Sequence, residues 1–145
     1  MLPDNIQLEV VTPERYVLQE TVQWIEMPGK EGYLGILPGH APLITELGVG
    51  VLTYRKGSEL RYLSVIEGYA EVLPDRVIVL AEFSERAEEI DVQKTQFSLD
   101  EAKADITKAQ LGDEAWQTAM RNMDRLSARL QAAHLGKGAA RSDGH

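Results

Sequence analysis

Cysteine is absent from the 145-residue chain, which excludes disulfide bonds and thiolate metal ligands. This absence is typical of a reducing compartment. Histidine is nearly as scarce, and His40 is the only one outside the C-terminal segment. Because no cysteine or second histidine stands at ligand spacing from His40, the sequence predicts no metal site.

Long hydrophobic runs are absent too. The first ten residues, MLPDNIQLEV, have neither a basic start nor an extended apolar stretch, so we expect no secretory signal. No segment is apolar for long enough to cross a bilayer as a helix. We therefore expect any attachment to a membrane to pass through a partner protein.

Basic residues are outnumbered, with 15 Lys and Arg against 23 Asp and Glu and a net charge of −8. This balance argues against a nucleic-acid partner, which requires a basic surface. The charge is uneven, since residues 121–141 hold five basic residues and one acidic residue. A basic end on an acidic chain predicts an anionic target: a carboxylate-rich surface, a phosphate or the chain's own acidic part.

Residues 1–87 have the patterns of β-strands. Ile6, Leu8 and Val10 alternate with their neighbours, and residues 21–27 (TVQWIEM) are β-branched and aromatic. Short apolar runs follow at regular intervals, with no helical pattern between them. Turn signals separate these runs at Pro28-Gly29, Lys56-Gly57, Gly68 and Leu73-Pro74-Asp75-Arg76. This organisation predicts an antiparallel β-sandwich or barrel.

The composition changes at about Ser84, after which Ala, Gln, Lys, Glu and Leu dominate and apolar residues recur at helical spacing. Gly112-Asp113 suits the end of one helix and the cap of the next. The pattern predicts an antiparallel two-helix hairpin over 88–136 and a flexible tail over 137–145. The fold class is then α+β. Since much of the apolar stripe is alanine, we expect weak docking and more than one docked state.

No constellation for catalysis is evident. Gly29-Lys30 lacks the other residues of a phosphate loop, because Trp24 replaces its first glycine and Glu31 its hydroxyl residue. Gly48 and Gly50 match half of a GxGxxG motif and are typical of a bulge or turn. His40 has no nucleophile to activate, so it either bonds the backbone or contacts a partner. We also interpret Glu88, Glu89 and Asp91 as capping residues at a helix start.

Two segments are typical of binding rather than chemistry. Residues 32–52 (GYLGILPGHAPLITELGVGVL) are apolar and punctuated by Gly and Pro, which indicates a shaped loop at 38–42 of the kind that meets partners. Arg121, Arg125 and Arg129 are spaced i, i+4, i+8 and form one helical stripe. The stripe is either a solvated face or a site for carboxylates or phosphates.

These segments together resemble a known family. The order of GYLGILPGHAPLITELGVGVL, VIEGYAEVLPDRVIVLAE (residues 65–82) and a helical hairpin resembles the epsilon subunit of the bacterial rotary ATP synthase over residues 4 to about 135. The most specific element is GxLGxxPGHAPL at 32–43. The resemblance implies a flattened sandwich of about ten strands that binds the gamma subunit and rests on the c-ring. It also implies a non-catalytic rotor subunit in the central stalk of a proton-translocating ATP synthase, peripheral on the cytoplasmic face of the bacterial inner membrane.

The resemblance also implies roles for individual residues. The region around Glu31, His40 and Pro42 would face the c-ring. The hairpin would fold against the sandwich or extend along gamma into the catalytic head and inhibit ATP hydrolysis. In the extended form, Arg121, Arg125 and Arg129 would meet acidic segments of the catalytic subunits.

Some members of this family bind ATP as a weak regulatory ligand on the folded hairpin, through a motif of Ile or Leu, Asp, two residues, Arg and Ala. Here the motif reads Ile90-Asp91-Val92-Gln93-Lys94-Thr95, so its Arg and Ala are replaced. The implied ATP site comprises Asp91, Lys94, Arg125 and Arg129. The alternatives are a free-standing nucleotide-sensing switch and a small β-sandwich hydrolase, and the missing nucleophile–base pair disfavours the hydrolase.

Overall fold

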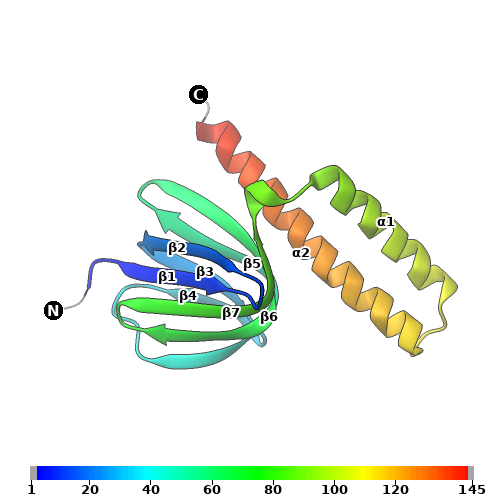
Figure 1. The fold of residues 1–145 in the computed structure, drawn as a ribbon, viewed down its shortest axis with the longest axis horizontal. Helices are drawn as coiled ribbons and strands as arrows, with labels where there is room; N and C mark the ends of the chain where they lie inside the picture. Colours follow the sequence, from blue (N-terminus) through cyan, green and yellow to red (C-terminus); the bar gives the residue numbers. More distant parts are fainter. Residues whose placement is uncertain (1–2, 144–145) are drawn as a thin grey trace.

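The β-domain is a single sheet of seven strands that curls over on itself, in a computed structural model that describes residues 3–143 (Figure 1). The strand order is β2-β1-β7-β6-β5-β3-β4. All neighbours pair antiparallel except β1 and β7, which run parallel. The strands are β1 (Ile6–Val11), β2 (Tyr16–Val22), β3 (Trp24–Gly29), β4 (Gly32–Ile36), β5 (Leu43–Lys56), β6 (Glu59–Leu73) and β7 (Arg76–Arg86).

The α+β class is confirmed, but the expected count of about ten strands is wrong, since the described residues form seven. The difference arises in β5 and β6, which are 14 and 15 residues long and stay paired along their length. The turn signal at Gly68 predicts a break between strands, yet Gly68 lies inside β6. Glycine there lets the strand bend without losing its partners on either side.

Period-two alternation places the core between the two layers of the curled sheet. In β1, for example, Ile6, Leu8 and Val10 are fully buried while the residues between them are not. Burial of each large aliphatic side chain contributes about 1.5–3 kcal/mol relative to exposure. The largest fully buried side chains of the cluster are Ile6, Leu8, Val10, Val22, Ile25, Met27, Ile36, Leu47, Leu52, Leu63, Val65 and Val72.

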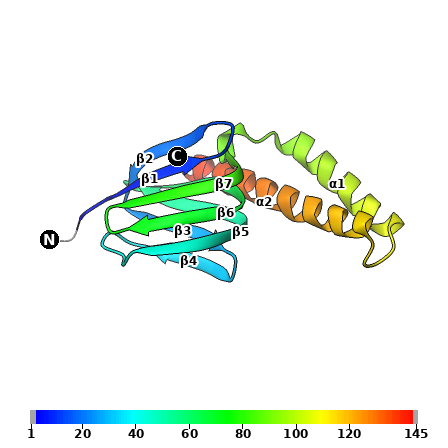
Figure 2. The same ribbon diagram turned by 60° about the horizontal axis from the view of Figure 1, so that its bottom comes forward.

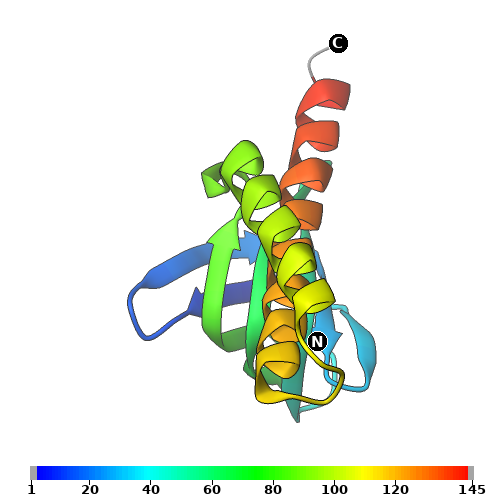
Figure 3. The ribbon, with the colours of Figure 1, turned by 90° about the vertical axis from the view of Figure 1, so that its right-hand side faces the viewer.

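The hairpin follows β7 after a short 3-10 helix, η1 (Ala87–Glu89), and consists of α1 (Val92–Lys108) and α2 (Glu114–Asp143). Asp91 caps α1 by accepting a hydrogen bond from the Lys94 amide at 3.1 Å. The two helices lie across one end of the β-domain, with α1 packed mainly on α2 (Figures 2 and 3). No helix within 3–143 is long and apolar enough to span a membrane.

The second helix extends further than the sequence pattern indicates. We placed the end of the hairpin at Gly136, but α2 continues to Asp143, and the last two residues of the expected tail lie outside the described range. Gly136 is a contact point rather than a helix stop, because a Cβ built on it would lie 2.6 Å from the Cβ of Ala87. Glycine there brings α2 close to η1.

Gly68 gives a test of the bend. Its φ is +134°, and an added Cβ would overlap the carbonyl oxygen of Leu80. We expect Gly68→Ala to lower the free energy of unfolding by about 3 kcal/mol or more, measured by urea denaturation with tryptophan fluorescence. The control is Gly57→Ala, which has φ +65° but open space around the Cβ and should cost only about 1 kcal/mol. Equal losses would show that the clash with β7 contributes nothing.

Candidate functional site

The contact between hairpin and β-domain is the first candidate site, and its apolar part is small. Its buried cluster comprises Val51, Ile90, Ala132 and Ala133, with Tyr62 and Val92 packed around it. Alanine side chains supply the α2 side of this cluster. Since hydrophobic stabilisation scales with buried area, the docking is much weaker than the packing inside the β-domain.

Arg129 joins the hairpin to the β-domain through a forked ion pair. Its Nε donates to Oε1 of Glu85 at 2.6 Å and its Nη2 to Oε2 at 3.4 Å. The two side chains are 31% and 32% exposed. Glu85 lies near the end of β7, so this pair connects the middle of α2 to the strand that leads into the hairpin. Forked, charge-assisted pairs of this kind fix orientation as well as charge.

Arg125, one turn earlier on α2, makes two looser contacts with the β-domain. Its Nη2 lies 3.9 Å from Oε2 of Glu67, and its guanidinium lies over the Phe83 ring, 5.8 Å from the centroid. Glu67 has φ 55°, a left-handed conformation that is unusual for a residue other than glycine. The bend in β6 therefore carries the carboxylate that faces α2.

The third arginine of the stripe is placed differently. Arg121 is exposed, and among the described residues its side chain bonds only the Thr118 hydroxyl, at 3.5 Å. The stripe is therefore divided, because Arg125 and Arg129 hold carboxylates of the same chain while Arg121 faces solvent.

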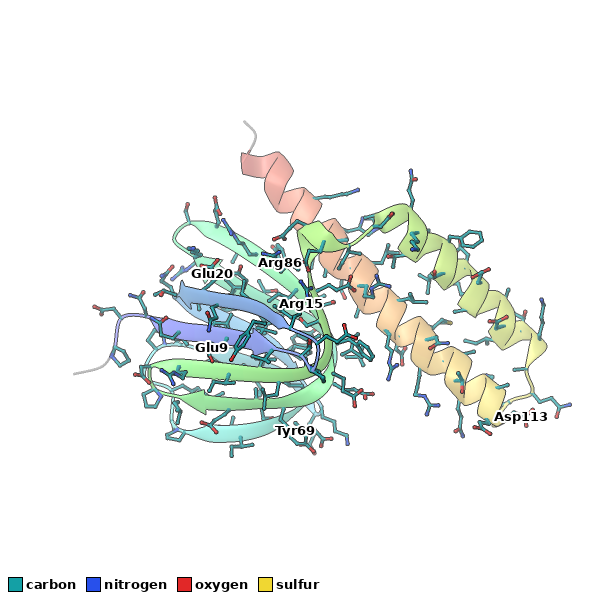
Figure 4. The ribbon with its side chains drawn as sticks, in the orientation of Figure 1. Glu9, Arg15, Glu20, Tyr69, Arg86 and Asp113 are labelled. Atoms are coloured by element: carbon teal, nitrogen blue, oxygen red, sulfur yellow. The ribbon has the colours of Figure 1, made fainter. Side chains whose placement is uncertain are left out.

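Glu89 closes a separate clamp where the β-domain meets the hairpin. Arg15, in the β1–β2 loop, donates to both carboxylate oxygens at 2.9 and 2.6 Å, and Arg86 donates at 2.8 and 3.3 Å. Both arginines are labelled in Figure 4. The Arg86 amide adds a further bond at 3.2 Å. The Arg15 guanidinium is the main cause that lowers the pKa of Glu89 to about 2. The clamp fixes η1 to the β-domain.

A cavity of about 490 Å³ lies between the hairpin and β6–β7. It brings Arg125 and Arg129 together with Phe83, but Asp91 and Lys94 do not line it. Asp91 is engaged as the cap of α1, and Lys94 is exposed. The cavity also contains three carboxylates, from Glu85, Glu101 and Asp105. The structure thus separates the four residues of the implied ATP site into two pairs.

Glu31, His40 and Pro42 all lie beside β4, an edge strand of the sheet. Glu31 is in the turn before β4, whereas His40 and Pro42 follow it, so the strand separates them. His40 Nδ1 donates to the Ala41 carbonyl at 2.7 Å, a backbone bond of the kind that the sequence suggests as one of two roles for this residue. Glu31 and Pro42 are exposed. Exposed Leu37 and Ile44 flank the loop and give this edge an apolar character.

An exposed apolar patch covers the outer side of β6 and β7, and sequence analysis missed it. Tyr69, which is labelled in Figure 4, and Leu80 are cross-strand neighbours that are 56% and 55% exposed, and Phe83 lies three residues further along β7 at 54%. Beside them lies a cavity of about 710 Å³ that includes Glu67, Glu82 and Lys30 in its lining. Clustered large apolar side chains on a surface mark an interaction site. The period-two pattern alone could have indicated that Tyr69 and Leu80 face outward.

Comparison with known proteins identifies the family to which this chain belongs. Residues 5–87 match the model of the ATP synthase delta/epsilon chain β-sandwich domain. The ATP synthase epsilon chain of Solibacter usitatus is 45% identical over 132 residues, covering 91% of this chain and 98% of that relative. The chain belongs to the ATP synthase epsilon chain family. The epsilon chain of Koribacter versatilis is 52% identical over 95 residues, which is 66% of this chain and 67% of that one.

Two solved ATP synthase structures contain chains of similar fold. A chain in the cryo-EM structure of the Euglena gracilis mitochondrial ATP synthase, OSCP/F1/c-ring, is similar with a TM-score of 0.78 and 28% identity. The match covers 92% of this chain and 84% of that chain. A chain of the Tetrahymena thermophila mitochondrial ATP synthase central stalk/c-ring shares the fold, with a TM-score of 0.60 at 19% identity over 88% of this chain and 96% of that one.

The clamp predicts a specific pH dependence. Because the folded state lowers the pKa of Glu89 from 4.5 to about 2, the ionised carboxylate stabilises the fold above about pH 4.5 and loses this effect toward pH 2. After allowance for solvent screening, we expect Glu89→Gln to cost about 1 kcal/mol at pH 7 in denaturant unfolding, with the difference vanishing near pH 2.

The control for the clamp is Glu88→Gln. The Glu88 side chain is 69% exposed and its one ion-pair contact is 3.8 Å long, so its loss should change stability by less than about 0.5 kcal/mol. A cost for Glu89→Gln that is the same at pH 7 and pH 2.5 would contradict the role of the charge.

Proposed function

We propose that this chain is a non-catalytic subunit of the central stalk of a proton-translocating ATP synthase, where it helps to transmit c-ring rotation to the catalytic head. The observation that carries the proposal is the 45% identity to an epsilon chain over 98% of that relative. Similarity to a chain from a solved ATP synthase that includes the c-ring supports it.

The gamma subunit is the partner that we propose for the apolar patch of Tyr69, Leu80 and Phe83. The patch lies on neighbouring strands of a rigid sheet, beside the cavity at the bend of β6. A stalk subunit must transmit torque without slipping, which favours a broad apolar contact with a polar rim. Glu67, Glu82 and Lys30 provide such a rim.

The edge at β4 is the surface that we propose for the c-ring. Leu37 and Ile44 are 61% and 72% exposed there, and the backbone bonds of the loop hold it in shape: Gly39 N donates to the Pro74 carbonyl at 2.7 Å, and His40 N to the Leu37 carbonyl at 3.2 Å. Contact through this edge would make the chain a peripheral protein at the cytoplasmic face of the bacterial inner membrane, bound through the complex.

The hairpin is the part that we propose to be a mobile inhibitor of ATP hydrolysis. Its apolar docking relies on small side chains, so the docked and extended states can lie close in free energy. Its second helix carries the stripe of Arg121, Arg125 and Arg129, which suits acidic segments of the catalytic subunits when the hairpin extends.

A nucleotide-sensing switch is the weaker alternative. The cavity beside α2 holds Arg125 and Arg129, but both are paired with carboxylates, and two further carboxylates, from Glu101 and Asp105, line the space. Such a site repels phosphate unless the ion pairs open. ATP as a regulatory ligand would therefore require rearrangement of the hairpin.

Deletion of residues 91–145 tests the inhibitory role. The deletion starts after Glu89, because that residue completes the clamp with Arg15 and Arg86. In the assembled enzyme we expect severalfold faster ATP hydrolysis with ATP synthesis retained, measured on membranes with co-purification of gamma as the assembly control. Unchanged hydrolysis would remove the inhibitory role and leave the stalk placement intact.

Calorimetric titration tests the nucleotide alternative. We expect no saturable heat when ATP is added to the isolated full-length chain at up to about 1 mM, because the cationic side chains are already neutralised. Saturable heat that disappears in Arg129→Gln would contradict this expectation and favour the switch.

A further inference from the structure

The docked hairpin already holds its arginines on carboxylates, and these belong to the β-domain. Arg129 pairs with Glu85, and Arg125 contacts Glu67 and Phe83. The chain therefore contains an internal version of the acidic surface that the arginine stripe would meet on another subunit. Of the three arginines in the stripe, Arg121 is the one directed to solvent.

We propose that Glu67, Phe83 and Glu85 form a latch that keeps the hairpin docked by occupying Arg125 and Arg129. Release then exchanges the internal carboxylates for carboxylates of a partner, so that neither Arg125 nor Arg129 is left without a counter-charge in either state. The consequence for hydrolysis rests on the proposed inhibitory function, whereas the latch is a property of the isolated chain.

The clamp at Glu89 locates the pivot of this movement. Two arginines of the β-domain side hold the Glu89 carboxylate, so η1 stays with the β-domain when α2 leaves. Asp91 caps α1 through the Lys94 amide, and its carbonyl accepts a bond from the Thr95 hydroxyl at 2.7 Å. It therefore moves with the helix. The joint between the two parts is Ile90, whose backbone is extended with φ −86° and ψ 123°.

The latch matters because the rest of the docking contact is slight. The apolar cluster has two alanines on α2, and neither ion pair is fully buried, with side chains between 31% and 45% exposed. Loss of one partly exposed ion pair changes an equilibrium constant by about 1.5- to 5-fold. That factor would be negligible for the fold of the β-domain, but it is substantial for two states of similar free energy.

Glu67 gives independent support. A left-handed backbone at a residue other than glycine persists only where its surroundings hold it, and here it stands directly before Gly68 at the bend beside α2. Its carboxylate faces Arg125 across the contact. The strained backbone at Glu67 therefore lies at the contact between the β-domain and the hairpin.

The latch can be tested on the isolated full-length chain, which has no native cysteine. Ser58→Cys and Gln110→Cys provide label sites on the exposed β5–β6 turn and the hairpin tip, and single-molecule energy transfer then reports docked and extended populations. We expect Glu85→Gln or Arg129→Gln to raise the extended-to-docked ratio about two- to fivefold. The swap Glu85→Arg with Arg129→Glu should restore it, and unaltered populations in the single variants would overturn the latch.

Matched controls separate the latch from general damage. Glu82→Gln removes an exposed carboxylate of the same strand and should leave the populations unchanged. Gly136→Ala should favour the extended state through its clash with Ala87, while Gly138→Ala, which meets nothing within 4 Å, should not. Glu67→Asn keeps a residue that tolerates the left-handed backbone and should act like Glu85→Gln. An effect of Glu82→Gln equal to that of Glu85→Gln would overturn the specific pairing.

Hydrolysis by the assembled enzyme distinguishes failure of the latch from failure of the proposed inhibition. Enzyme assembled with the Glu85→Gln chain should hydrolyse ATP more slowly than enzyme with the unmodified chain, because more hairpins are extended. Enzyme with the Arg121→Gln chain should hydrolyse ATP faster, while the docked and extended populations of the isolated chain stay the same. If Glu85→Gln releases the hairpin and hydrolysis does not change, the latch is supported and the inhibitory function is overturned. If the populations do not shift, the latch is overturned whatever hydrolysis does.

Discussion

The close approach of β6 and β7 at Gly68 is the constraint on which most of the molecule depends. Only a residue without a side chain fits against the main chain of Leu80 there, and this lets β5 and β6 bend together while they stay paired. The bend gives the curled sheet its two layers and directs Glu67 toward α2. It also leaves Tyr69 and Leu80 on the outer side, so the core, the proposed latch and the exposed apolar patch share one origin.

Two kinds of packing coexist in the chain and serve different needs. The β-domain encloses large aliphatic side chains and forms a rigid body. The hairpin rests on alanines, a glycine contact and two ion pairs. A stalk subunit must transmit force without deforming, while the hairpin, if it acts as the proposed inhibitor, must change state for a small change in free energy. The division at Ile90 separates these requirements.

Local features of the fold could be predicted from sequence because their causes are local. The Leu73–Arg76 turn joins β6 to β7, Asp91 caps α1, and the alanine stripe forms the weak docking face. The predicted strand count is wrong because a glycine such as Gly68 can mark a bend within a strand as readily as a break between strands. The predicted end of α2 is wrong because Gly136 lies inside the helix, where it allows close contact with Ala87.

The ion pairs of the candidate site could not be predicted, since they join distant parts of the chain. Arg129 is 44 residues from Glu85, and Arg15 is 74 residues from Glu89. In addition, arginine and glutamate side chains are normally exposed to solvent, so the sequence gives no sign that these four are paired. The arginine stripe left a solvated face, carboxylates and phosphates open as alternatives, and periodicity alone does not show that Arg125 and Arg129 meet carboxylates of the same chain.

The parallel pairing of β1 with β7 affects how the chain is made. The first strand cannot complete the sheet until the last strand has been synthesised, so the β-domain closes late and through long-range contacts, which slows folding. The hairpin follows β7 in the sequence, so its residues emerge from the ribosome after all seven strands have been synthesised. The order of synthesis thus gives the docking surface time to form before its helices arrive, and the hairpin adds to a finished body instead of competing for its core.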